Sequence, residues 1–373
     1  MNRKFLRSIL FLFVLTVATA ASWHWGNPVK RRFSARGLQV SLPPAKAEQA
    51  AKIVISWRDV HTTLKLENGS WLIEERENRP ASVPRISALL NSLGTLAPVK
   101  ELRNLTPETL RALRLVDNDP KLVPGVRVIL YDASGKALFN ILLGKGHFMR
   151  PEPGTHPSGE AEGRYVLIDG RVYLLPVVFE NCHPIPAVWV EPLRMHELRR
   201  SLHMTALRFE KGKGHPVWSV YRKSTAHPFS MAYPAGKTAD NQKLSALADR
   251  LSKPFTMDYY IPEKPLKIEY KQRLTIRCAD GFSYVLSLAE GTPQYDIVSL
   301  SVQYDPKRIL RFPGETEAQY QRRLQGLKQR FEFESRYSSG QLFKTGKELS
   351  KLLDTVPEKA AGSKGNRGAG PGK

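Results

Sequence analysis

The sequence predicts an α+β fold in which a mainly antiparallel sheet-plus-helix unit is repeated in tandem. Three observations support this prediction: strand-like runs joined by tight turns, helical runs with one apolar face, and recurrence of these elements in the same order. The chain has 373 residues, enough for two domains at roughly 150 residues each. Its 41% hydrophobic and 25% charged residues exclude a multi-span membrane protein, a collagen-like chain and a wholly disordered one.

The N-terminus predicts a membrane anchor over residues 1–25. A basic start precedes an apolar run, and Trp23 and Trp25 lie where an interfacial aromatic belt would be. From Ile9 to Trp25 a helix would reach about 25 Å, the lower limit for crossing a bilayer. The alternative is a cleaved signal peptide, with Ala18-Thr19-Ala20 as the cleavage site. Either segment exports the rest of the chain, so we expect a single-pass protein of a bacterial inner membrane with the bulk of the chain periplasmic.

Two α+β units are expected after a basic, proline-containing spacer over residues 26–50. The first unit covers residues 51–200, where Asn68-Gly69 is a strong hairpin signal between two strand-like runs. Residues 83–96 have apolar side chains at helical spacing. The strands expected in this unit, including the two on either side of Asn68-Gly69, are 52–56, 64–67, 70–73, 126–131, 137–143, 165–168 and 172–175.

The second unit, residues 201–312, repeats elements of the first at offsets of roughly 150 residues. A strand with Trp218 matches the strand with Trp71, and residues 245–251 share the pattern S-A-L-x-x-x-L with residues 87–93. The turn at Gly281 matches the turn at Gly135. This recurrence indicates a tandem duplication.

Residues 313–357 are expected to form a C-terminal helical segment. The helix over 315–331 is amphipathic, because Tyr320, Leu324, Leu327 and Phe331 recur at intervals of three or four residues. These four residues are the candidate partner surface, and the alternative is that they pack on the protein's own second unit. The tail over 358–373 is basic and glycine-rich, and we expect it to be disordered.

The net charge of +22 raises the question of nucleic-acid binding. Basic residues are concentrated before the apolar run, in the spacer and in the tail, so residues 51–357 are only mildly basic. No nucleic-acid-binding signature is present, and we expect no nucleic-acid partner. The basic ends favour attraction to anionic lipid or an acidic envelope polymer, or they serve solubility alone.

Catalytic and metal motifs are incomplete in this sequence. His196-Glu197 begins a zinc-like pattern, but Arg200 stands where H-E-x-x-H requires histidine. Cys182 precedes His183, although adjacent residues rarely form a nucleophile–base pair. We therefore expect no catalytic, cofactor-binding or metal-ligating residues and no cofactor. Cys182 and Cys278 could form one disulfide in an exported domain, or remain buried thiols.

Several segments together resemble a known family. The strings KIVIS…LKLENGSWLI, RISALLNSLGTL, NLTPETLRALRL, VRVILYDASGKALFNILLGKG and GRYVLIDGRVYLL are similar, in this order, to domain-of-unknown-function family 4340. The resemblance covers residues 50–180 well and 205–310 weakly. It implies an N-terminal membrane segment, a duplicated strand–helix–strand unit and association with gliding-motility-type ABC transport systems. It brings no functional residues.

The function that these expectations favour is a non-enzymatic, membrane-anchored, extracytoplasmic interaction module. Its partner is expected to be an envelope or membrane protein, with ABC transporter subunits as the candidates that the resemblance implies. One alternative is a periplasmic protein that binds a glycan or an anionic polymer. Another is a hydrolase whose carboxylates are brought together only by the fold.

Overall fold

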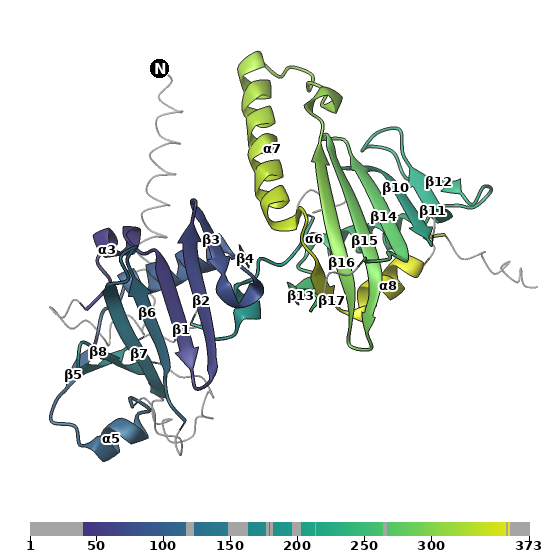
Figure 1. Cartoon of the computed structure of the whole chain (residues 1–373). Helices are drawn as coiled ribbons and strands as arrows, with labels where there is room; N and C mark the ends of the chain where they lie inside the picture. The colour runs from purple at the N-terminus through teal and green to yellow at the C-terminus, as the bar shows by residue number, and fades with distance from the viewer. Residues whose placement is uncertain are drawn as a thin grey trace, which may run out of the picture. The chain divides into compact units, whose positions relative to one another are not determined.

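The computed structural model describes residues 40–116, 123–147, 163–176, 179, 182–195, 203–212, 214–263, 267–355 and 357–358. The predicted anchor, most of the spacer and nearly all of the tail lie outside these residues. Over the described part, the fold is α+β with two mainly antiparallel sheets and few helices (Figure 1). None of the helices in this part is both long and apolar enough to cross a bilayer.

The chain divides into two compact units. The first holds the described residues up to Gly69 and those of Pro84–Ile185; the second holds Ser70–Val83 and the described residues from Pro186 onward. The chain therefore passes from one unit to the other three times. Each unit is described on its own below.

The first sheet has nine strands and is built largely from hairpins. In spatial order the strands are β4 (Arg79–Pro80), β3 (Ser70–Ile73), β2 (Val60–Glu67), β1 (Lys52–Trp57), β6 (Val126–Tyr131), β7 (Ala137–His147), β8 (Gly163–Ile168), β9 (Arg171–Leu175) and β5 (Lys100–Leu102). The predicted hairpin turn lies between β2 and β3. Asn68 and Gly69 both have positive φ there, 49° and 73°, as the turn type favoured in two-residue hairpins requires.

Three helices accompany this sheet: α3 (Pro44–Glu48), α4 (Val83–Gly94) and α5 (Pro107–Ala112). The helix predicted over 83–96 is α4, and it buries Ile86, Leu89 and Leu93. Each such side chain stabilises the fold by roughly 1.5–3 kcal/mol through removal from water. α5 begins at Thr106, whose hydroxyl accepts from the Thr109 amide at 3.2 Å.

A small apolar cluster lies beside α5 on the first sheet. Leu142 of β7 and Val172 of β9 belong to it together with Leu115, which follows the helix. Leu110 of α5 and Leu167 of β8 pack against the same cluster. This part of the sheet therefore has apolar residues on both of its faces.

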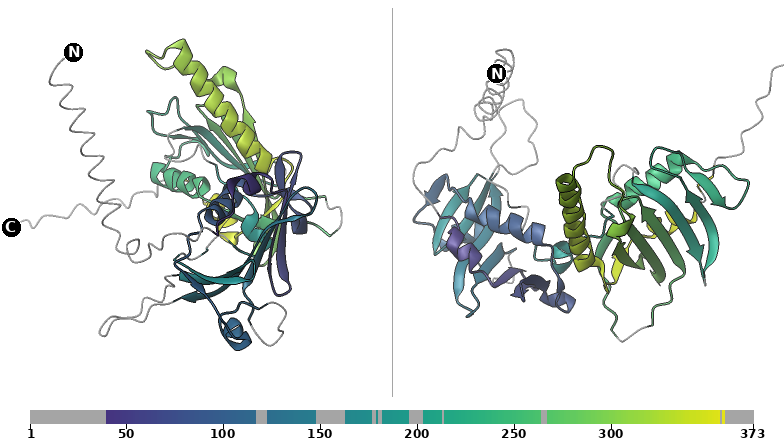
Figure 2. Two further views of the ribbon diagram at one scale, coloured as in Figure 1. Left: turned by 90° about the vertical axis from the view of Figure 1, so that its left-hand side faces the viewer. Right: turned by 90° about the horizontal axis from the view of Figure 1, so that it is seen from above.

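The second sheet has eight strands and is accompanied by three α-helices. In spatial order the strands are β12 (Ser230–Tyr233), β11 (His215–Tyr221), β10 (Met204–Lys211), β14 (Gln272–Cys278), β15 (Phe282–Thr292), β16 (Tyr295–Tyr304), β17 (Phe343–Thr345) and β13 (Thr256–Tyr259). The helices are α6 (Asn241–Ser252), α7 (Glu317–Ser338) and α8 (Lys347–Asp354). α7 runs beside β16 in every view (Figures 1 and 2).

One face of the second sheet forms the core of its unit. Phe209 of β10 and Trp218 of β11 are fully buried and lie with ring centroids 5.7 Å apart. The Trp218 indole donates to the Leu353 carbonyl of α8 at 3.1 Å, so α8 covers this face. Phe331 of α7 stacks on Tyr304 of β16, which places α7 over the same side.

The two sheets share an order of strands. If β4 is set aside, β3-β2-β1-β6-β7-β8-β9-β5 corresponds one for one to β12-β11-β10-β14-β15-β16-β17-β13. The helices α4 and α6 occupy the same place in chain order, and Leu89 and Leu247 are buried at matching positions. The expected match of Trp71 with Trp218 is wrong, because Trp71 lies on β3 whereas Trp218 lies on β11, the counterpart of β2. In register Trp218 corresponds to Thr62.

The segment Ser70–Val83 contains β3 and β4 of the first sheet but groups with the second unit, to which polar contacts tie it. Arg76 forms a bidentate pair with Asp258, with its Nε and Nη2 each donating at 2.8 Å. The neighbouring Tyr259 hydroxyl donates to the Pro80 carbonyl at 2.9 Å. Bidentate pairing of this kind fixes geometry as well as adding energy, so it ties the segment to β13.

Candidate functional site

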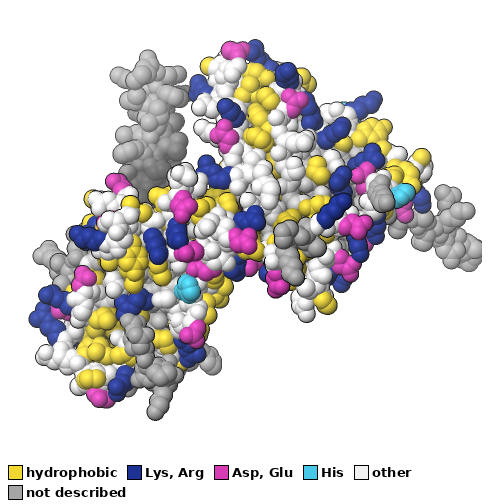
Figure 3. Space-filling view, in the orientation of Figure 1, with side chains coloured by type: hydrophobic (Ala, Val, Ile, Leu, Met, Phe, Trp, Pro, Cys, Tyr) yellow, Lys and Arg dark blue, Asp and Glu magenta, His cyan; other side chains and the backbone are white. Residues whose placement is uncertain are grey.

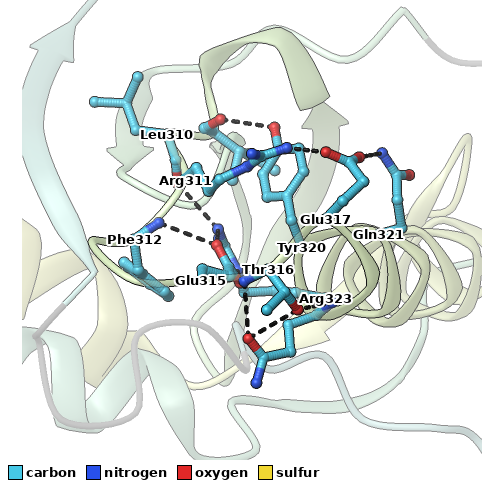
Figure 4. Close-up of polar contacts among 11 residues, drawn as sticks. Leu310, Arg311, Phe312, Glu315, Thr316, Glu317, Tyr320, Gln321 and Arg323 are labelled. Carbon is cyan, nitrogen blue, oxygen red and sulfur yellow. Dashed lines mark hydrogen bonds and ion pairs between the residues drawn. The ribbon is translucent and has the colours of Figure 1, made fainter.

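The connection from β16 into α7 is the most structured surface feature of the second unit. We call residues 305–323 the elbow (Figure 4). Asp305 begins it by accepting from the Lys307 amide at 3.0 Å, which starts a short 3-10 turn. Thr316 then caps α7: its hydroxyl accepts from the Gln319 amide, while the Gln319 side chain accepts from the Thr316 amide at 2.9 Å. This reciprocal capping box fixes where the helix begins.

Arg323 of α7 holds the elbow in place by contacts with three of its residues. Its Nε donates to Glu315 Oε1 at 2.9 Å, and its Nη2 donates to Glu315 Oε2 at 2.8 Å and to the Leu310 carbonyl at 3.0 Å. The guanidinium also lies over the Phe312 ring, 4.1 Å from its centroid. A single side chain therefore binds three points of the loop (Figure 4).

A second set of contacts lies around Tyr320. Its hydroxyl donates to the Ile309 carbonyl at 3.0 Å, and Ile309 itself is buried. The Arg311 guanidinium lies 5.2 Å from the Tyr320 ring centroid and pairs with Glu317. Stacked arginines of this kind lose little freedom when they bind a partner, because the planar group is already oriented.

The hydrogen bonds of the central ion pair of the elbow favour its charged form. Its hydrogen bonds to Arg323 hold the pKa of Glu315 below its usual value, and the same bonds raise the pKa of Arg323. Both shifts favour the ionised forms.

Two large apolar side chains project from this locked loop. Leu310 is 81% exposed and Phe312 is 61% exposed, the two highest values among the exposed large hydrophobic residues of the described chain. Rigid apolar and aromatic side chains next to arginine are the composition of binding hot spots. The elbow can therefore offer apolar contact without a large ordering cost.

The four predicted surface residues lie on α7 and are half-buried; Tyr320 belongs to the elbow, and the other three lie further along the helix. Phe331 stacks on Tyr304 with centroids 5.9 Å apart, and the Tyr304 hydroxyl donates to the Leu324 carbonyl at 3.4 Å. Tyr320 and Leu327 complete this stripe, which runs along the side of α7 that packs on the second unit itself. Sequence reasoning missed the exposed pair in the elbow because they precede the helix; the signal was the run Arg308–Phe312, with apolar residues between arginines.

Two carboxylates are buried beneath α7 and could suggest a site assembled by the fold. Glu334 of α7 is 6% exposed and Asp280, in the β14–β15 turn, is 9% exposed; neither carboxylate makes a well-formed hydrogen bond to the described residues. Burial raises the pKa of Glu334 to about 7 and raises that of Asp280. The cavity beside Glu334 has a volume of about 20 Å³, which is room for one water molecule. A substrate does not fit there.

The remaining sequence motifs take simple places. Cys182 of the first unit and Cys278 of the second unit are free, buried thiols in the structure. Burial raises the pKa of Cys182 to about 12, which makes it a poor nucleophile. The segment with His196 and Arg200 lies outside the described residues. Within the described part, no three His, Cys, Asp or Glu side chains are grouped so as to hold a metal ion.

Comparison with known proteins gives no relative. No family model, no curated protein and no solved structure matches the chain. The resemblance of residues 50–180 to a family therefore remains an expectation from the sequence.

Proposed function

We propose that this protein is a membrane-anchored, extracytoplasmic interaction module that binds an envelope protein partner through the elbow. The observation that carries the proposal is the exposure of Leu310 and Phe312 on a loop locked by Arg323. A capping box, a bidentate ion pair and ring stacking hold this loop in one conformation, and in that conformation two apolar side chains face solvent. Such exposure is expected where those side chains insert into a partner.

The surroundings of the exposed pair define the chemistry of that partner. Arg311 and Arg323 lie next to Leu310 and Phe312 in the elbow (Figure 4). Because Glu317 and Glu315 pair with these arginines, the complementary surface is an apolar pocket with a polar rim. On the resemblance of residues 50–180, we propose that this surface belongs to a subunit of an ABC-type envelope transport system.

The anchor and the duplication are part of the same proposal. Residues 1–25 supply the single membrane span, and deleting them should give a soluble protein that stays in the cytoplasm. The duplication is supported by the shared strand order of the two sheets and by the matched buried leucines of α4 and α6. One copy of the duplicated unit would then carry the elbow between its counterparts of β8 and β9.

Site-specific photocrosslinking in native membranes tests the elbow. A photoreactive residue replaces Leu310 in one variant of the full chain and Phe312 in another. A third variant carries it at Met257, a control position elsewhere in the second unit that is 55% exposed. We expect one discrete crosslinked product from the two elbow positions and none from the control. The same product from all three positions, or none at all, would contradict the proposal.

Charge substitution separates contact from folding. Leu310→Glu with Phe312→Glu should abolish the crosslink to a probe at a neighbouring elbow position with only a small loss of melting temperature, because both side chains are exposed and only the Phe312 ring contacts Arg323. Leu324→Glu with Leu327→Glu should lower the melting temperature instead, because these side chains are half-buried. If the second pair leaves stability unchanged and removes the crosslink, then the helix, and not the elbow, is the interface.

A further inference from the structure

Over β10, β11 and β14, the face of the second sheet opposite its core carries polar side chains. Strand alternation turns Arg208 of β10 and Thr275 and Arg277 of β14 away from the buried side chains of the same strands. Its middle strands β15 and β16 contribute serines to this face, as the pairs Ser287 with Ser299 and Val285 with Ser301 show. In Figure 3, much of the surface of the second unit between α7 and a series of Lys and Arg side chains is white, the colour of the backbone and of side chains that are neither hydrophobic nor charged.

A hollow of about 600 Å³ lies on this face. That volume is within the range of small-molecule sites, roughly 300–1,000 Å³. Small residues from adjacent strands provide its floor, and longer ones its border. The side chains that matter for recognition are Arg208, Glu210, Ser219, Tyr221, Thr275 and Arg277.

The two arginines of the hollow are arranged to meet an anion. Arg208 pairs with Thr275 across the strands and Ala206 pairs with Arg277, so the arginines are diagonal neighbours, roughly 7–8 Å apart at Cα. Glu210 holds Arg208 at 2.6 Å, which orients one guanidinium. Arg277 is exposed and has no side-chain partner among the residues that the structure describes.

The rest of the hollow suits a polyol. Within the described chain, the hydroxyls of Ser219 and Thr275 make no hydrogen bond, so both can donate to and accept from a ligand. The Tyr221 ring is 50% exposed at the border and offers an apolar face on which a sugar ring can stack. Hydroxyl groups, an aromatic face and two guanidiniums together match a sugar that carries acidic groups.

The fold does not require these residues. Aligned by strand register, the first sheet has Val54 where the second has Arg208, and Ile129 where the second has Thr275. Both sheets form with the same strand order. The cationic and hydroxyl-bearing character is therefore particular to the second sheet, as expected of a binding surface and not of a packing requirement.

We infer that this hollow binds an acidic oligosaccharide, with Arg208 and Arg277 on its acidic groups and Tyr221 against a sugar ring. The open shape leaves part of the ligand in solvent, which fits a segment of a longer chain. The inference uses none of the elbow residues, so it stands or falls independently of the proposed function.

The test is calorimetric titration of the full chain in an uncharged detergent with a galacturonic acid tetrasaccharide. Maltotetraose is the uncharged sugar, and inorganic triphosphate is the anion without a sugar. We expect saturable binding of the acidic tetrasaccharide alone. Arg208→Ala and Arg277→Ala should each weaken it about tenfold or more, because each removes a charge-assisted contact. Arg171→Ala, an exposed arginine of the first sheet, is the matched control and should change nothing.

Tyr221→Ala distinguishes sugar recognition from simple anion binding. It should weaken the acidic tetrasaccharide without altering the melting temperature, because the ring is exposed. The inference is overturned if the acidic tetrasaccharide gives no saturable binding at about 1 mM, a weak limit for specific recognition. It is also overturned if triphosphate binds as tightly through the same arginines, or if Arg171→Ala has the same effect as Arg277→Ala.

Discussion

Replacing Glu334 with Gln should stabilise the second unit at about pH 8 and leave its stability at about pH 4 unchanged. In the folded protein, burial raises the pKa of Glu334 from 4.5 to about 7. Below pH 4.5 the carboxyl is protonated in both states and costs nothing. Between pH 4.5 and about 7 the unfolded chain loses the proton while the folded chain keeps it, so the free energy of unfolding falls as the pH rises.

The size of the effect follows from the shift. One pKa unit corresponds to about 1.4 kcal/mol, so the shift of Glu334 costs the native state about 3 kcal/mol once the pH exceeds 7. Burial is the largest influence on the pKa of Glu334, and the negative charge of Asp280 raises this pKa further. Tyr284 and Arg330 favour the charged form, but burial outweighs these two contributions. Glutamine keeps the volume of the side chain and removes the ionisation. The gain at about pH 8 should therefore approach that full amount.

Chemical denaturation of the full chain, followed by tryptophan fluorescence, measures this gain. Trp189 and Trp218 are 1% and 0% exposed in the second unit, so their emission reports its unfolding. Glu332→Gln is the control: Glu332 is exposed on the same helix and lies 3.9 Å from Lys328. It should shift stability by no more than about 0.5 kcal/mol. The reasoning fails if Glu334→Gln stabilises equally at every pH, or if it gives no gain at about pH 8.

Two further predictions follow from burial and backbone geometry. The thiols of Cys182 and Cys278, whose pKa values are raised by burial, should resist alkylation in the native protein at about pH 8 and react together on unfolding; fast native alkylation of either would show an accessible thiolate. Gly281→Ala should lower the melting temperature far more than Gly135→Ala, as thermal unfolding of the two variants would show. Both glycines have positive φ, but a methyl group on Gly281 would lie 2.5 Å from the Asp305 carbonyl, whereas one on Gly135 meets nothing within 4 Å. Equal losses would refute the steric argument.

Elements with a strong local signal could be predicted from the sequence. Asn68-Gly69 supports positive φ at both turn positions, and α4 shows its buried face in a single periodic run. The strands β5 and β13 are three and four residues long, too short to carry a periodic signal. The ten-residue strand β16 was not predicted, although its apolar residues alternate with serines, as in a strand with one buried face.

The candidate site was harder to predict for a physical reason. The amphipathic stripe of α7 gave the helix but not its partner, since an apolar face does not state whether it packs within the chain or outside it. The helix also continues past the expected end at Phe331 to Ser338, where Glu334 is buried. A carboxylate in the core contradicts the pattern from which helices are predicted. The oligosaccharide hollow depends on the register between β10 and β14, which only the folded sheet supplies.

The placement of Ser70–Val83 within the second unit has a consequence for how the protein is made. During synthesis Ser70–Val83 leaves the ribosome long before Pro186. The second unit can therefore fold completely only after the chain from Pro186 onward has been synthesised. A gene fragment that begins at Pro186 would lack Arg76 and Pro80, leaving Asp258 without its bidentate partner and the Tyr259 hydroxyl without its acceptor. The strands of the second sheet all follow Pro186, so such a fragment would keep its sheet and lose only these contacts of Ser70–Val83.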